Sequence, residues 1–288
     1  MSLLSQIFAP GRFGLSFELF PPKTVEGEAA LYQNLAELAA FKPDFVTCTY
    51  GAGGSTRSKT LEIISEVKKR HSLPIASHLT CVGSTQEQLR EYLRDALEKK
   101  VDFIVALRGD PPKGETTFTA VEGGLRYANE LVAMLKAEFP QFGLLVAGYP
   151  ETHQEAISPE ADLDNLKRKV DAGADIIVTQ LFYDNADFFR FRDRCVAKGI
   201  RIPIVPGLLP VTSLSQIQRI TSLCKAKLPS SFVEKLAKRE DADWHFQVGV
   251  EECTSQAQEL IREGAPGIHF YVLNKSQATA GVLKSIRH

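Results

Sequence analysis

Eight apolar runs alternate along the chain with segments of helical periodicity. The segments between them, such as 28–41, 57–70 and 85–99, place apolar residues at steps of three and four, which is typical of amphipathic helices. Successive parallel strands need crossovers of this kind. The pattern therefore predicts repeated strand–helix units. The apolar runs are 15–20 (LSFELF), 45–50 (FVTCTY), 75–81 (IASHLTC), 102–110 (DFIVALRGD), 143–149 (GLLVAGY), 175–182 (DIIVTQLF), 202–209 (IPIVPGLL) and 267–274 (GIHFYVLN).

Eight such units predict an α/β fold, a (β/α)8 TIM barrel that forms a single domain over residues 1–288. About 60 residues follow the seventh run and carry three helical segments, broken at Pro229 and near Asp241, so we expect an elaborated helical connection between strands 7 and 8. The strand ends of a barrel meet at one mouth, so the polar residues that end the runs are expected to share one site.

An open doubly wound sheet shares this alternation and is the competing architecture. The glycine-rich segment 51–56 (GAGGST) follows a predicted strand but lacks the third glycine of the dinucleotide fingerprint. Eight units favour closure into a barrel. Segment 51–56 fits either a phosphate loop or a plain glycine-rich turn.

Composition narrows the class of protein. The 288 residues are 44% hydrophobic and 24% charged, with a net charge of -1, which is typical of a soluble globular protein. Basic residues form no block for nucleic acid, and no apolar stretch approaches the ~18 residues of a membrane span. The N-terminus lacks the features of a signal peptide, so we expect a cytoplasmic protein. The five widely separated cysteines form no C-x-x-C pair and predict reduced thiols.

Two acids stand at the ends of apolar runs. Glu18 lies in FELFPPK, where burial is expected to raise its pKa and suit it to general acid catalysis. Asp110 ends ALRGDPP, after Gly109, which permits close approach of a ligand to the backbone. A solvated rim acid and a turn aspartate are the alternative interpretations of these two residues.

Histidines also end two runs, but their spacing does not predict a metal site. His78 and His153 are isolated from each other, and there is no H-x-H pair or carboxylate-bridged histidine cluster. We therefore expect no bound metal.

The segment 161–173 (ADLDNLKRKVDAG) predicts an amphipathic helix with a polar face. Asp162, Asn165, Arg168 and Lys169 lie beside its apolar stripe and form either a site for a diphosphate and ribose or a solvated helix face.

The motifs along nearly the whole chain resemble the methylenetetrahydrofolate reductase family, in its catalytic-domain-only bacterial form. The resemblance implies a barrel that holds FAD non-covalently, uses NADH or NADPH as reductant, and converts methylenetetrahydrofolate to methyltetrahydrofolate. The motifs are FELFPPK, TCTYGAGGSTR, ASHLTC, ALRGDPP, AGYPETH, DLDNLKRKVDAGADIIVTQLFYD, PGLLPV and HFYVLN.

The resemblance also implies roles for individual residues. Glu18 matches the family's catalytic acid, and Asp110 matches an acid near both flavin and pterin. Gln180, Gln216 and Lys275 match folate-binding positions. Lys275 replaces a common arginine, which changes a bidentate contact to a point charge, and Ile220 stands where some members have phenylalanine. The remaining FAD-binding positions are Thr49, Tyr50, Ala52, His78, Arg108, Gly109, Tyr127, Ala128, Tyr149, His153, Ala156, Asp162, Asn165, Arg168 and Lys169.

Two other functions remain open at this point. One is a different pterin-binding barrel enzyme, such as a methyltransferase, or an aldolase, although no lysine ends a strand to form a Schiff base. The other is a non-catalytic flavin-binding barrel. Methylenetetrahydrofolate and NAD(P)H are the expected small-molecule partners, and the sequence leaves homo-oligomer formation open.

Overall fold

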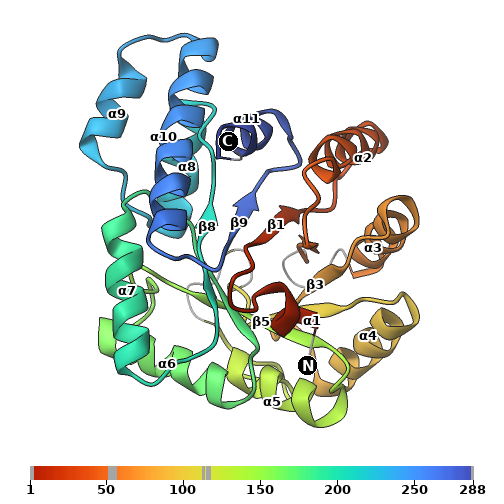
Figure 1. Ribbon diagram of the computed structural model, residues 1–288. Coiled ribbons are helices and arrows are strands. Elements are labelled where there is room, and N and C mark those ends of the chain that lie inside the picture. Colours follow the sequence, from red (N-terminus) through yellow and green to blue (C-terminus); the bar gives the residue numbers. More distant parts are fainter. Residues whose placement is uncertain (1–2, 51–56, 112–113, 115–117, 287–288) are drawn as a thin grey trace.

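Nine parallel strands form one sheet in a computed structural model that describes residues 3–50, 57–111, 114 and 118–286 (Figure 1). Their order is β7-β6-β5-β4-β3-β2-β1-β9-β8. The strands are β1 (Gly14–Leu19), β2 (Phe45–Cys48), β3 (Ile75–Thr80), β4 (Phe103–Leu107), β5 (Gly143–Gly148), β6 (Ile176–Thr179), β7 (Ile204–Val205), β8 (Gly207–Leu208) and β9 (Gly267–Tyr271).

The seventh predicted strand is divided at Pro206, and this division closes the barrel. β7 pairs with β6, whereas β8 pairs with β9. Proline has no N–H to donate, but its carbonyl oxygen accepts a hydrogen bond from the His269 N–H at 2.9 Å. The two short strands thus occupy one place in the barrel, and the predicted (β/α)8 architecture is confirmed.

Helices surround the strands as the periodicity predicts, with ends shifted by up to three residues. The segment 202–267 carries three helices, so the elaborated connection is confirmed; α9 and α10 stand out from the barrel in Figure 1. The helices are α1 (Leu3–Ile7), α2 (Val25–Ala39), α3 (Arg57–His71), α4 (Gln86–Glu98), α5 (Ala128–Glu138), α6 (Pro159–Asp171), α7 (Asn185–Ala197), α8 (Leu214–Cys224), α9 (Ser230–Ala237), α10 (Ala242–Arg262) and α11 (Gln277–Ile286).

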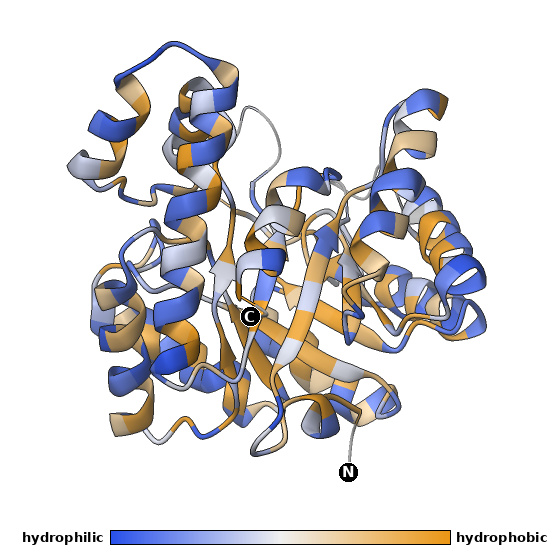
Figure 2. Cartoon of the chain, turned by 45° about the horizontal axis from the view of Figure 1, so that its top comes forward, coloured by the Kyte–Doolittle hydropathy of each residue, from blue (hydrophilic) through white to orange (hydrophobic). Residues whose placement is uncertain are grey.

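Capping side chains fix where several helices begin. The Thr85 hydroxyl accepts from the Gln88 N–H, and the Gln88 side chain accepts from the Thr85 N–H, a reciprocal capping box at the start of α4. Ser158 caps α6, with Pro159 in its first turn. The outer helices carry both hydrophilic and hydrophobic residues in Figure 2, whereas the strands are largely hydrophobic, which fits helices that bury one face against the barrel.

The short helix α1, which the apolar pattern did not reveal, closes the amino-terminal end of the barrel. Leu4 and Phe8 belong to the apolar cluster that fills the barrel interior together with Phe45 and Phe103. The rings of Phe8 and Phe45 meet edge to face at 6.3 Å, and those of Phe45 and Phe103 at 5.5 Å. This end of the barrel is therefore a packed core.

Across the described part of the chain, no helix combines the length and apolar character that a membrane crossing requires.

Candidate functional site

A cavity of about 540 Å³ opens at the carboxyl ends of the strands. Its volume lies within the range of small-molecule sites, and its position is where the active sites of this fold lie. Ten of the residues predicted from the sequence line it, which brings together positions in or just after six of the eight runs. They are Glu18, Thr49, Tyr50, His78, Arg108, Gly109, Asp110, Tyr149, His153 and Gln180.

Glu18 contacts His78 at the floor of this cavity. β1 pairs with β2, and β2 with β3, which places the two side chains on the same inner surface. His78 Nε2 lies 3.4 Å from Glu18 Oε2. Burial raises the pKa of Glu18 from its usual 4.5 to about 8 and lowers the pKa of His78 to about 4. At neutral pH the contact therefore joins a protonated carboxylic acid to a neutral imidazole and is not an ion pair.

A second buried histidine lies next to this pair. Ser16 Oγ and His269 Nδ1 are hydrogen-bonded at 2.8 Å across the β1–β9 pair. The His269 ring meets the Tyr271 ring edge to face at 5.2 Å, and the Tyr271 hydroxyl donates to the Thr179 carbonyl at 2.7 Å. Burial and the nearby His78 lower the pKa of His269 to about 3. Glu18 is thus surrounded by neutral groups.

The β4 end supplies the arginine and the close backbone approach that the sequence indicated. Arg108 makes two hydrogen bonds to the Glu155 carboxylate, at 2.6 and 2.8 Å, and these raise its pKa. Gly109 has φ +89°, and a Cβ there would lie 2.7 Å from a Val82 methyl group. A side chain is therefore strained at this position and would crowd the wall. Asp110 follows at the exposed rim.

The polar residues of α6 form two pairs, which differs from the single predicted face. Asp162 accepts from the His153 N–H at 2.9 Å, and partly buried Lys169 donates to the Ala147 carbonyl, so these two point toward β5 and the segment that follows it. Burial lowers the pKa of Lys169 to about 8. Arg168 and Asn165 are exposed and hydrogen-bonded to each other at 2.9 Å. Lys169 lies seven residues after Asp162, which places these two residues two turns apart along the same side of the helix.

The other predicted positions lie outside the cavity lining. Tyr127 and Ala128 begin α5, and the Tyr127 side chain is exposed. Gln216 on α8 accepts from the Thr212 hydroxyl at 2.8 Å, and Lys275 is exposed after β9. Ala156 is partly buried between β5 and α6. Ala52 and the segment 51–56 lie outside the described residues.

Several inward-facing residues of the cavity were not predicted. Thr47 and Thr80 line it with buried hydroxyls that have no hydrogen-bond partner in the described structure. Tyr271 and His269 also line it. The two threonines lie inside apolar strands, so only the alternation of side chains along a strand pointed to them. Ile220 from α8 forms part of the opposite wall.

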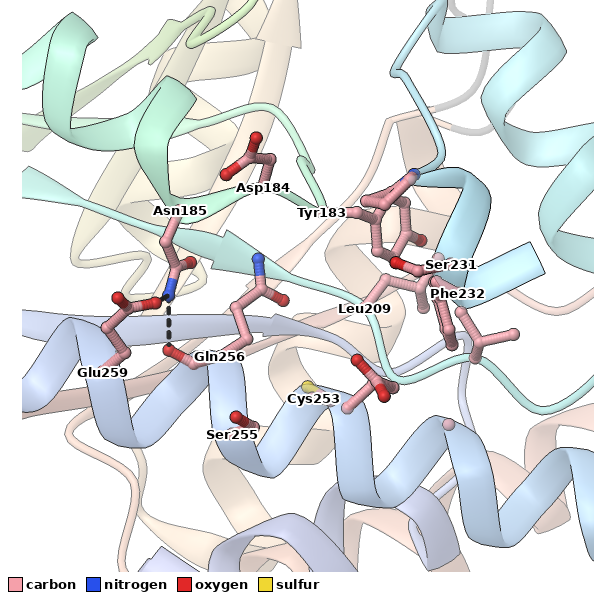
Figure 3. Close-up of a pocket in the computed structure, with 14 residues that line it drawn as sticks. Tyr183, Asp184, Asn185, Leu209, Ser231, Phe232, Cys253, Ser255, Gln256 and Glu259 are labelled. Carbon is pink, nitrogen blue, oxygen red and sulfur yellow. Dashed lines mark hydrogen bonds between the residues drawn. The ribbon is translucent and has the colours of Figure 1, made fainter. Parts of the chain in front are cut away.

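A second cavity, of about 310 Å³, lies between the β6–α7 loop, α9 and α10 (Figure 3). None of the residues predicted from the sequence lines it. Its carboxylates are engaged within the protein: Glu252 pairs with Lys235, and Glu259 accepts from Asn185 at 2.6 Å. The chemistry indicated by the sequence therefore gathers at the barrel mouth and not here.

Thiol and metal chemistry find no support in the described structure. All five cysteines are free. Cys48 and Cys81 are buried near the mouth, and burial raises the pKa of both thiols, that of Cys81 to about 12. The described residues contain no group of three or more histidines, cysteines and carboxylates that would hold a metal ion.

Solved structures with similar folds are barrels of low sequence identity. A Clostridium thermocellum protein described as binding two copies of 5-methyl-5,6,7,8-tetrahydrofolic acid matches with a TM-score of 0.65 and 14% identity, over 98% of this chain and 97% of that one. Dihydropteroate synthase from Xanthomonas albilineans matches with a TM-score of 0.52 and 15% identity, over 95% of this chain and 91% of that one. These likenesses support the fold.

Sequence comparisons identify the family. 5,10-Methylenetetrahydrofolate reductase of Pectobacterium carotovorum is 41% identical over 279 residues, covering 96% of this chain and 91% of that protein. The Escherichia coli enzyme of the same name is 40% identical over 277 residues, with the same coverage. A maize protein named methylenetetrahydrofolate reductase (NADH) 1 is 39% identical, and 48% of its length is covered. The family model for methylenetetrahydrofolate reductase matches residues 3–287, so this chain belongs to the methylenetetrahydrofolate reductase family.

Proposed function

We propose that this protein reduces methylenetetrahydrofolate to methyltetrahydrofolate in two alternating half-reactions at the barrel mouth, with bound FAD and with NADH or NADPH as reductant. Family membership supports the folate reaction. The observation that carries the proposal is Glu18, whose pKa burial raises to about 8, at the floor of a cavity whose volume lies in the range of small-molecule sites.

The residues present fit FAD. Arg108 at the end of β4 and Lys169 on α6 offer cations for a diphosphate, and Gly109 lines the cavity with backbone alone, which permits close approach of a ring system. Asp162 and Asn165 offer acceptors for ribose hydroxyls. When bound there, FAD would supply the hydride-transfer chemistry that links the nicotinamide to the folate.

Glu18 acts in the folate half-reaction only. Opening the five-membered ring of the folate requires a proton on the departing nitrogen, and a carboxylic acid that remains protonated at neutral pH supplies it. Hydride transfer from the nicotinamide requires no such proton. Asp110 and Gln180 at the rim orient the pterin, and the apolar wall that includes Leu107, Val178 and Leu209 excludes water.

Anaerobic mixing tests the proposal. The purified protein is expected to be yellow, to be bleached by NADH or NADPH, and to regain its colour when methylenetetrahydrofolate is added. Comparing the two nicotinamides identifies the reductant. A colourless protein that binds no FAD contradicts the proposal, and bleaching without recovery leaves only a flavin-binding barrel.

A further inference from the structure

Thr47 has an unpartnered hydroxyl in the floor of the mouth. The residue is only 2% exposed, and its Oγ1 has no hydrogen-bond partner in the described structure. Burying a hydroxyl without a partner is unfavourable. The Oγ1 atom is also almost completely covered, so solvent does not reach it in this conformation. A partner for it must therefore come from a nearby group that moves.

Glu18 is the polar side chain placed to be that partner. Glu18 and Thr47 are directly paired in the β1–β2 register, and both line the mouth cavity, so their side chains leave the sheet on the same face. Adjacent strands are about 5 Å apart, which a small rotation of a glutamate side chain can bridge. The Glu18 side chain is 21% exposed to the cavity, so it has room to turn from His78 toward Thr47.

Among the described residues, the groups packed around Glu18 carry no positive charge that would stabilise a carboxylate. Cys48 on β2, His78 on β3, and His269 and Tyr271 on β9 are all neutral at pH 7, since burial raises the pKa of the thiol and the phenol and lowers the pKa of both imidazoles. The Tyr271 hydroxyl already donates to the Thr179 carbonyl. Stabilisation of the ionised acid must therefore come from hydrogen-bond donors.

We propose that Thr47 is a positioning residue for Glu18, whose hydroxyl donates a hydrogen bond to the carboxylate that remains after proton donation. This role rests on the proposed function. In the step, the O–H bond of Glu18 breaks, an N–H bond forms on the departing folate nitrogen, and the negative charge stays on Glu18. The charge is then held by Thr47 and by His78 in the tautomer that carries its proton on Nε2.

The first test measures ionisation of Glu18 directly in the flavin-free protein. Infrared difference spectra over a pH titration follow the C=O stretch of the protonated carboxyl group, with Glu18→Gln as the blank. Thr47→Val keeps the shape of the side chain and removes the donor, so the pKa of Glu18 should rise by about one unit, a tenfold change in its ionisation constant. Thr47→Ser should restore the wild-type value. Among the described residues that line the mouth cavity, Thr80 has the other unpartnered hydroxyl, on the Gly109 side, and Thr80→Val should leave the pKa of Glu18 unchanged.

The second test uses the flavin-loaded enzyme. Thr47→Val should slow reoxidation by methylenetetrahydrofolate about tenfold and leave reduction by NAD(P)H unchanged, and Thr47→Ser should recover the lost rate. An unchanged pKa of Glu18 in Thr47→Val, failure of serine to restore it, or equal slowing of both half-reactions overturns the proposal. Thr47→Ala replaces the valine variant if that variant does not fold. If the wild-type protein shows no folate-dependent reoxidation, the proposed function fails, and the infrared titration still decides whether Thr47 stabilises the Glu18 carboxylate.

Discussion

The two ends of the barrel differ in how their buried groups are satisfied. At the amino-terminal end, Leu4, Phe8, Phe45 and Phe103 form an apolar plug with ring contacts of 5.5 to 6.3 Å. At the carboxyl end, burial holds Glu18 in the protonated form that water does not favour at neutral pH and keeps two histidines neutral, and two threonine hydroxyls have no partner in the described residues.

The two ends of the same closed sheet therefore have different roles: the amino-terminal end stabilises the fold, and the carboxyl end holds the candidate site. The plug contributes apolar burial and contains no group whose charge changes near neutral pH. Keeping a carboxylic acid protonated at the mouth lowers the free energy of unfolding at neutral pH. A pKa shifted in this way inside a cavity is typical of functional sites. Substitutions at one end should therefore change stability with little effect on chemistry, and substitutions at the other end should do the reverse.

The largest effect is expected at Glu18. Glu18→Gln keeps the shape of the side chain but cannot donate a proton, so reoxidation by methylenetetrahydrofolate should fall by about 10²- to 10⁴-fold. Reduction by NAD(P)H should stay near the wild-type rate. Rapid mixing of each half-reaction measures both values. Equal loss in the two half-reactions would indicate a damaged site, and an unaffected second half-reaction would remove Glu18 from the mechanism.

Phe8→Ala tests the opposite end. Phe8 is 8% exposed and packs on Phe45, so its truncation should lower the free energy of unfolding by about 3 kcal/mol. Both half-reactions should keep their rates below the unfolding transition. Phe13 is 40% exposed, and Phe13→Ala is the matched control with an expected change below about 0.5 kcal/mol. Denaturant titration measures both, and a loss of turnover in folded Phe8→Ala would contradict the separation of the two ends.

The sequence predicts the strands of the barrel better than it predicts the features at its two ends. All eight runs became barrel positions, because strands buried on both faces are recognisable as short apolar runs followed by crossovers. Helix α1 was missed because its five residues are too few to show a period. The break at Pro206 was missed for a different reason, since strand pairing on either side of a proline depends on the closed barrel.

At the mouth, motif spacing located Glu18, Asp110 and the other strand-end residues but did not show their surroundings. Thr47 and His269 lie within apolar runs, where the sequence does not reveal which face of each strand turns inward. The partial burial of Lys169 was also not evident, because a lysine on a polar helix pattern is usually solvated. These properties depend on contacts between strands and helices that are distant in sequence.

A substitution of Lys169 tests the role of a charged group near the mouth and leaves Glu18 unchanged. Lys169→Met keeps the length of the side chain and removes the cation proposed for the FAD diphosphate, so the dissociation constant of FAD should rise about tenfold or more. Lys167 lies on the same helix and pairs with Asp171 at the surface, so Lys167→Met is the matched control and should bind FAD as the wild type does. Fluorescence titration of the flavin-free proteins gives both constants. Equal affinity in the two variants would assign Lys169 to its bond with Ala147 alone.

The smallest expected effect is a pH dependence of stability that belongs to the mouth alone. Folded Glu18 holds its proton to about pH 8, whereas an ordinary glutamate in the unfolded chain releases it near 4.5. Between these values the folded state binds the extra proton on Glu18, so the contribution of Glu18 to the free energy of unfolding should fall as pH rises from 4.5 to 8 and then level off. The full difference corresponds to at most about 5 kcal/mol. Because the side chain is 21% exposed to the cavity, we expect about 1–2 kcal/mol.

Glu18→Gln has no such proton, so the stability of wild type relative to this variant should decline over this range, whereas Phe8→Ala should keep a constant offset from wild type. Denaturant titrations at a series of pH values measure both differences, and a constant offset for Glu18→Gln would show that Glu18 ionises in the folded protein as it does in water.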